Sequence, residues 1–151
     1  MDGRRQAHMD VLVAVFWKPD GTQPRGLLQR REQEHVKETT SSQPRRNRSP
    51  RHPHRDMEII TYVREGAITH EDNLGNRGRT VAGDVQIMSA GTGIQHSEFN
   101  LEDETTKIFQ IWIIPNRDGH APRWETKTFP RGENAGELVM LASGRAGDAA
   151  T

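Results

Sequence analysis

The sequence predicts an all-β protein, and three observations lead to this expectation. Short runs rich in β-branched and aromatic residues recur from Met57 onward. Clusters of Gly, Asp, Asn and Pro separate these runs at intervals of about ten residues, a spacing typical of a β-sandwich or barrel. No stretch in this part of the chain keeps the helical period of an amphipathic helix. We therefore expect an all-β sandwich or barrel.

The expected strands follow one another in chain order. They cover residues 57–63, 67–70, 85–88, 108–114, 124–129 and 138–142. The first ends at the turn-forming pair Glu65 and Gly66, and the second leads into a hairpin loop at 72–76, which holds the Asp, Asn and Gly residues that such loops require. The strand at 108–114 is nearly continuously apolar and stops at Pro115.

Residues 1–50 have a different character. The stretch 18–51 holds nine Lys or Arg residues and four Asp or Glu residues, with almost no apolar side chain after residue 37. Such a stretch cannot bury enough apolar surface to offset the entropy of ordering it, so we expect a disordered basic segment. The part 44–51 could be a nuclear-targeting or RNA-binding patch, although a solvated linker is the favoured interpretation. Residues 146–151 are expected to be a disordered tail.

Composition excludes several kinds of function. The 21 basic and 21 acidic residues give no net charge, so no membrane or direct nucleic-acid partner is expected. Cysteine is absent, which excludes disulfides and thiolate sites and leaves nitrogen and oxygen ligands for any metal. The apolar run 11–17 is too short to span a bilayer, and no secretory cleavage site follows it. We therefore expect an intracellular protein.

Two short clusters carry the chemistry of the sequence. His52 and His54 flank a proline, and His96 and Glu98 flank a serine. Side chains two positions apart on a strand point to the same face, so each cluster offers two ligands together. Three imidazoles and one carboxylate suit a divalent metal such as Fe, Mn, Ni, Cu or Zn. Glu58 has the same parity as the first cluster and is an alternative carboxylate, in which case Met57 and Ile59 would face the other way.

Simpler interpretations exist for each of these residues. An isolated His-x-His is usually a chance or surface pair, but the second cluster and the glycine turn at 91–94 strengthen the metal interpretation. Either Glu58 or Glu98 could be an exposed strand carboxylate. Trp112 and Phe109 are interpreted as core residues rather than a substrate platform. The remaining histidines lack such neighbours and are interpreted as surface residues: His8, His35, His70 and His120.

The stretches 52–58 and 89–98 together resemble the N-terminal barrel of the pirin family, whose members are bicupins. The resemblance continues through 110–113 to 138–141, so it covers about residues 51–145. It implies a cupin domain, a double-stranded β-helix, with a metal held by His52, His54, His96 and Glu98. It also implies that Glu58 lies outside the ligand set. Family members carry iron, and we therefore expect Fe(II), with Mn, Ni, Cu and Zn as alternatives.

The resemblance implies competing functions. Some members resemble quercetin 2,3-dioxygenases, so the leading prediction is a metal-dependent dioxygenase that opens a flavonol-like substrate, with Glu98 also acting as general base. The eukaryotic protein is described as a nuclear co-regulator, so the alternative is a non-enzymatic, iron-dependent partner of a transcription factor in the nucleus or cytoplasm. A third alternative is an inactive, truncated pirin. The chain covers one of the family's two barrels. Residues 1–50 also lack the family's aromatic strands, which close the barrel, so a sheet edge would be exposed.

Overall fold

The structure is a computed structural model that describes residues 12–16, 25–29, 36–115, 117–128 and 138–143. Within these ranges the chain forms antiparallel strands and turns and no helix, which confirms the all-β expectation. Among these described residues there is accordingly no helix that is long and apolar enough to cross a membrane.

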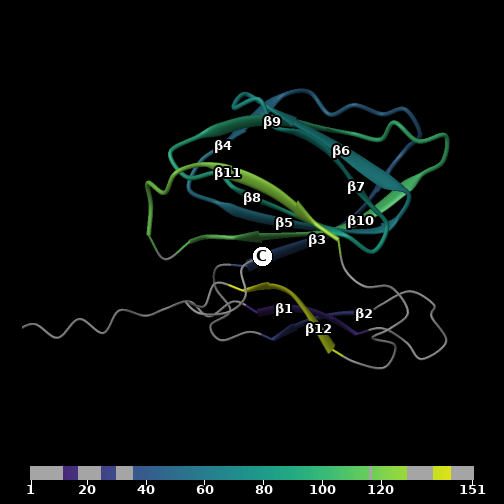
Figure 1. Cartoon of the computed structure of the whole chain (residues 1–151), viewed down its shortest axis with the longest axis horizontal. Helices are drawn as coiled ribbons and strands as arrows, with labels where there is room; N and C mark the ends of the chain where they lie inside the picture. Colours follow the sequence, from purple (N-terminus) through teal and green to yellow (C-terminus); the bar gives the residue numbers. More distant parts are fainter. Residues whose placement is uncertain (1–11, 17–24, 30–35, 116, 129–137, 144–151) are drawn as a thin grey trace, which may run out of the picture.

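Two sheets form the barrel (Figure 1). The five-stranded sheet has the order β11-β8-β5-β10-β3. Its strands are β3 (Val36–Gln43), β5 (Glu58–Glu65), β8 (Val85–Ser89), β10 (Thr106–Ile113) and β11 (Arg123–Lys127). The four-stranded sheet has the order β4-β9-β6-β7. Its strands are β4 (His52–His54), β6 (Ala67–Asp72), β7 (Arg77–Val81) and β9 (Ile94–Phe99).

A separate three-stranded sheet, β12-β1-β2, lies against the outside of the five-stranded sheet. It consists of β1 (Leu12–Phe16), β2 (Arg25–Gln29) and β12 (Leu138–Ser143).

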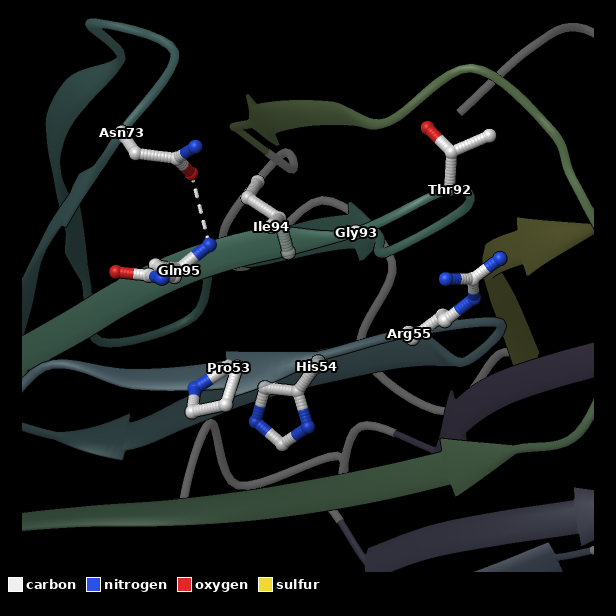
Figure 2. Close-up of a pocket in the computed structure, with 8 residues that line it drawn as sticks. All are labelled: Pro53, His54, Arg55, Asn73, Thr92, Gly93, Ile94 and Gln95. Atoms are coloured by element: carbon white, nitrogen blue, oxygen red, sulfur yellow. Dashed lines mark hydrogen bonds between the residues drawn. The ribbon is translucent and has the colours of Figure 1, made fainter.

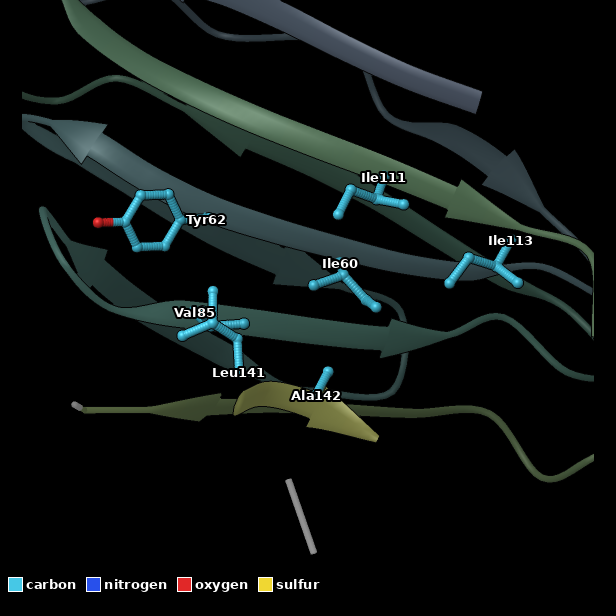
Figure 3. Close-up of a cluster of buried hydrophobic side chains, with 7 residues drawn as sticks. All are labelled: Ile60, Tyr62, Val85, Ile111, Ile113, Leu141 and Ala142. Carbon is cyan, nitrogen blue, oxygen red and sulfur yellow. The ribbon is translucent and has the colours of Figure 1, made fainter. Parts of the chain in front are cut away.

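Side chains of the five-stranded sheet alternate between the inside of the barrel and its outer face. The outer face is apolar and is covered by β12 (Figure 3). Its buried cluster consists of Ile60, Tyr62, Val85, Ile111, Ile113, Leu141 and Ala142. Complete burial of each large aliphatic side chain here contributes about 1.5–3 kcal/mol, so this cluster fastens the small sheet to the barrel.

The inner face of the same sheet is divided into layers. At one end, Ile59 of β5 belongs to a cluster that also contains Met88 and Ile94. At the other end, Val63 packs with Ile68 and Ile108. Between these two apolar clusters the inward positions of the strands are polar, because Thr61, Gln86 and Gln110 occupy them. The interior of the barrel therefore has a polar middle layer.

The segment 36–50 is ordered, which differs from the expected disorder of residues 1–50. Strand β3 pairs with β10 over eight residues, so backbone hydrogen bonds replace the missing apolar side chains. Asn47 and Arg48 then run beside the end of β9, where the Asn100 amide donates to the carbonyls of Gln43 and Pro44. The remaining residues of the expected segment, apart from β1 and β2, and the tail 146–151 lie outside the described residues. The domain boundary at residue 51 stays a prediction.

The basic stretch 44–51 runs along the surface of the barrel and is almost entirely exposed, and two of its arginines contact barrel residues. Arg46 pairs with Asp103 at 2.9 Å, and the guanidinium of Arg48 lies 4.2 Å from the centre of the Phe99 ring. The Arg48 guanidinium also reaches the Glu71 carboxylate at 3.5 Å. Long arginine stems can pack on the barrel while their charges stay at the surface, which the count of apolar residues did not anticipate.

Candidate metal centre

Strand pairing brings three of the predicted ligands together. Strand β4 pairs with β9 in a register that sets His52 opposite His96. The centres of the imidazole rings lie 4.6 Å apart for His52 and His96, 4.9 Å for His52 and His54, and 5.1 Å for His54 and His96. One nitrogen of each ring lies within 4.8 Å of the others, so one ion could contact all three.

Hydrogen bonding indicates which nitrogen each ring offers. The Nδ1 of His52 lies 2.9 Å from the carbonyl oxygen of Pro50, so Nδ1 carries the proton and Nε2 has a free lone pair. The Nε2 atoms of His54 and His96 are buried and have no hydrogen-bond partner among the described residues. Buried polar atoms are nearly always partnered, and two orphaned nitrogens on neighbouring rings therefore point to an absent ligand. A divalent metal matches this donor set.

The surroundings of His96 and His54 keep these two rings neutral at pH 7. Burial, followed by the effects of the neighbouring His52, His70 and His54, lowers the pKa of His96 to about 3. Burial, followed by the effect of His52, also lowers the pKa of His54. An imidazole must be neutral to bind a metal, so at neutral pH neither ring has a proton to lose before it can act as a ligand.

Glu98 lies on the next inward position of β9. Its side chain is buried, and its two oxygens accept hydrogen bonds from the amides of Gln86 and Gln110, at 2.5 and 3.3 Å. Burial raises the pKa of Glu98, although both amides and His52 oppose this shift. Ser49 fixes the backbone here, because its hydroxyl accepts from the Glu98 amide at 2.9 Å. The polar middle layer of the barrel thus holds this carboxylate in place.

Glu58 does not share the face of the histidines. The chain bends between β4 and β5, where Asp56 has a φ of +46°, and this bend breaks the parity that the sequence suggested. Ile59 consequently faces the barrel interior, whereas Glu58 accepts a hydrogen bond from the Ser89 hydroxyl at 2.5 Å. The predicted alternation of Glu58 and Ile59 is wrong for this reason.

His70 is buried, so its interpretation as a surface residue is wrong. It lies on β6 directly opposite Glu98 of β9, and its exposed fraction is 0%. Its ring stacks on Trp124, with 4.8 Å between the ring centres and 8° between the planes. His70 also forms a potential metal-binding group with His96 and Glu98. A signal was present in the sequence, because His70 and Asp72 have the same i, i+2 spacing as the two ligand clusters.

The other aromatic and histidine assignments have different outcomes. Trp112 packs against the inner cluster and Phe109 against the outer one, as expected for core residues. The Trp112 ring also meets the His54 ring edge-on, with 5.3 Å between centres. His120 is half-buried in a loop, and its carbonyl accepts from the Thr92 amide. His8 and His35 lie outside the described residues.

An open cleft lies beside the proposed ligands. Its volume is about 430 Å³, and its lining includes His54 together with Arg55 and Gln95 (Figure 2). The glycine turn that begins β9 forms one wall of it. Gly91 in this turn has a φ of +46°, and a Cβ there would lie 2.1 Å from the carbonyl oxygen of His120, so only glycine is accommodated.

The fold and the site together define a cupin, a β-barrel with histidine and carboxylate side chains gathered inside it. The chain belongs to the pirin family, because the family model described as Pirin matches residues 22–113. This confirms the resemblance seen in the sequence. The match begins before residue 51, so part of the segment that was expected to be divergent belongs to the family's domain.

Individual relatives agree with this assignment. A pirin-like protein of Caulobacter vibrioides is 69% identical over 100 residues, which are 66% of this chain and 43% of that protein. The quercetin 2,3-dioxygenase of Escherichia coli K12 is 47% identical over 97 residues, which are 64% of this chain and 42% of that protein. The crystal structure of the E. coli pirin YhhW in complex with nickel(II) superposes with a TM-score of 0.61 at 43% identity, covering 64% of this chain and 42% of YhhW. The chain thus spans about two fifths of the length of these relatives.

Proposed function

We propose that His52, His54, His96 and Glu98 hold one divalent metal, with Fe(II) as the native ion. The observation that carries this proposal is the pair of buried Nε2 atoms on His54 and His96 that have no partner among the described residues. The donor set and the nickel complex of the related YhhW support a divalent metal. Iron is the finer proposal, because sites of this composition accept several first-row ions.

We propose further that the site opens a flavonol-like substrate with dioxygen, as the name of the E. coli relative suggests. The metal would supply Lewis acidity and redox capacity at open positions. Glu98 would take the proton of the substrate hydroxyl, and burial helps because it makes this carboxylate more basic. Gln86 and Gln110 would keep its oxygens in position, and the apolar inner cluster around Ile59 would exclude water.

Oxygen consumption tests the enzymatic proposal. Iron-loaded protein is mixed with quercetin in an oxygen electrode, and the loss of quercetin absorbance is followed at the same time. We expect oxygen uptake to match quercetin loss and to vanish in His96→Ala, while His120→Ala behaves like the wild type. Free iron at the same concentration serves as the control for uncatalysed oxidation. Verified iron-loaded protein that consumes no oxygen would contradict the proposal.

The two alternative functions remain predictions. The nuclear role was expected from the family resemblance, with the basic stretch as weak additional support, and Arg46 and Arg48 of that stretch contact acidic residues of the barrel. A co-regulator should capture different partners in its ferrous and ferric states, and identical partners would count against that role. A truncated pirin that folds poorly would have no native metal site, so Fe(II) would not raise its melting temperature, whereas metal binding to a native state must raise it.

A further inference from the structure

We infer that His70 and Asp72 form a hydrogen-bonded relay that orients His96 and holds its proton on Nδ1, so that Nε2 is left free for the metal. The inference rests on the proposed metal site. It adds two positioning residues that lie behind the ligands and would not touch the metal.

The contacts form a continuous line from β6 to β9. The Nε2 of His70 lies 3.0 Å from Oδ2 of Asp72, and its Nδ1 lies 3.4 Å from Nδ1 of His96. The side chains of His70 and Asp72 are both completely buried, and His96 is 2% exposed. Water therefore does not compete for these hydrogen bonds, and each must be satisfied within the protein.

The direction of each hydrogen bond follows from its acceptor. An ionised carboxylate only accepts, so Nε2 of His70 must be the donor to Asp72. A neutral His70 then has a lone pair on Nδ1, which can accept only if Nδ1 of His96 carries a proton. His96 in this tautomer has its lone pair on Nε2, and this is the buried atom that has no partner among the described residues. The relay and the orphaned nitrogen thus require the same tautomer of His96.

Both members of the relay are held rigidly. Oδ1 of Asp72 accepts from the backbone amides of Leu74 and Asn76, and Oδ2 accepts from the Asn76 side chain. Burial opposes ionisation of Asp72, but the hydrogen bond from His70, followed by those from Asn76 and Leu74, lowers its pKa, so it remains a charged acceptor. The plane of His70 is fixed by the stacked ring of Trp124. Gly78 makes room for that ring, because a Cβ at this position would lie 2.3 Å from it.

A direct role for His70 as a metal ligand is the competing interpretation, since His70, His96 and Glu98 also lie close together. The hydrogen bonds argue against it, because both nitrogens of His70 are already engaged, one with Asp72 and one with His96. Partners of this kind, behind a histidine ligand, commonly fix its tautomer and raise its basicity.

The first test uses metal-free protein labelled with ¹⁵N at histidine. Two-bond ¹⁵N–¹H correlation spectra distinguish a protonated ring nitrogen from one with a lone pair. We expect His96 to carry its proton on Nδ1 and His70 to carry its proton on Nε2. A His96 ring with its proton on Nε2 would overturn the relay. Because this test needs no metal, its result stands even if the proposed function fails.

The second test measures Ni(II) affinity by calorimetry. His70→Phe keeps a ring against Trp124 but removes both nitrogens, and we expect affinity to fall by about 10- to 100-fold with one site per chain retained. His70→Asn restores an acceptor near Nδ1 and should recover part of the affinity. His120→Phe, the same change at a histidine outside the cluster, should have no effect.

Two results of the affinity test would overturn the relay. Unchanged affinity in His70→Phe would mean that His70 does not act on His96. A loss as complete as that in His96→Ala would identify His70 as a ligand. Circular dichroism checks that each variant is folded, and Asp72→Asn, which keeps the shape of the side chain, replaces His70→Phe if the latter does not fold. Asp72→Asn should return part of the His96 population to the tautomer protonated on Nε2. An unaltered ¹⁵N–¹H correlation spectrum of this variant would also overturn the relay.

Discussion

The two faces of the five-stranded sheet are made by the same strands but differ in chemistry. The outer face buries a continuous apolar cluster beneath β12 (Figure 3). On the inner face, apolar residues alternate with polar ones along each strand, as in the series Ile59, Thr61 and Val63 of β5. Strand β10 repeats this pattern inward with Trp112, Gln110 and Ile108.

This difference separates stability from function. The apolar outer cluster stabilises the fold in proportion to the area it buries. The inner layer instead holds a buried carboxylate and two buried imidazole nitrogens that find no partner in the described part of the chain, and such groups are unfavourable for folding alone. Buried polar groups that disfavour folding are expected where a protein has a ligand-binding site. The account therefore predicts that changes on the inner face affect binding and that changes on the outer face affect stability.

The largest effect is expected from His54→Ala on the inner face. Removal of one ligand should lower metal affinity by more than about 100-fold, which exceeds the usual effect of a residue behind the ligands. The unfolding free energy of the metal-free protein should change little, because the outer cluster is intact. Metal titration and urea denaturation measure the two quantities. Retained affinity would show that His54 is not a ligand.

Ile111→Ala on the outer face should have the opposite profile. Ile111 is 1% exposed in the centre of the outer cluster, so its truncation should lower the unfolding free energy by about 2–5 kcal/mol. Ile111→Val, which removes a single methylene, should cost about 0.5–1.5 kcal/mol. The folded fraction of either variant should still bind one metal. Weaker metal binding by the folded Ile111→Ala variant would contradict the prediction that changes on the outer face affect only stability.

Glu98→Gln should change stability and metal affinity in opposite directions: the metal-free protein should become more stable, and its metal affinity should fall. Burial raises the pKa of Glu98 above its ordinary value of 4.5, so its ionisation at pH 7 opposes folding. Removing the charge should stabilise the metal-free protein by on the order of 1 kcal/mol. The gain should disappear below pH 4.5, where the carboxyl is protonated in both states. Metal affinity should fall at the same time, and a variant that is destabilised at pH 7 would contradict this account.

Arg46→Ala at the surface should have the smallest effect. Its ion pair with Asp103 is highly exposed, with side-chain exposures of 77% and 82%. Such pairs contribute little, so the unfolding free energy should change by less than about 0.5 kcal/mol, with no change in metal affinity. Differential scanning calorimetry at low and high salt measures this. A larger loss would mean that the segment before β4 depends on this pair.

Several parts of the fold could be predicted from the sequence because they follow short-range rules. Strands such as β5 and β10 are dense in β-branched residues and end at turn residues, which is a strong local signal. The ligand candidates were visible because alternation on a strand places His52 with His54, and His96 with Glu98, on one face.

The parts that were missed depend on distant partners. Strand β3 contains few apolar residues and is held by pairing with β10, which no local pattern reveals. The burial of His70 depends on Trp124, which lies more than fifty residues along the chain. The position of Glu58 was predicted wrongly because a single residue, Asp56, in the left-handed region shifts the parity of the following strand. Tertiary contacts and one unusual φ angle thus determine which side chains face the barrel interior, and sequence alternation alone does not predict this.

X-ray absorption spectroscopy of the metal-loaded chain tests the central claim most directly. Multiple scattering from imidazole rings reports how many histidines bind the ion. The account predicts three imidazoles and one carboxylate oxygen from the protein, with two imidazoles remaining in His52→Ala. A spectrum with four imidazoles would bring His70 into the ligand set, and one with no imidazole scattering would contradict the metal centre itself.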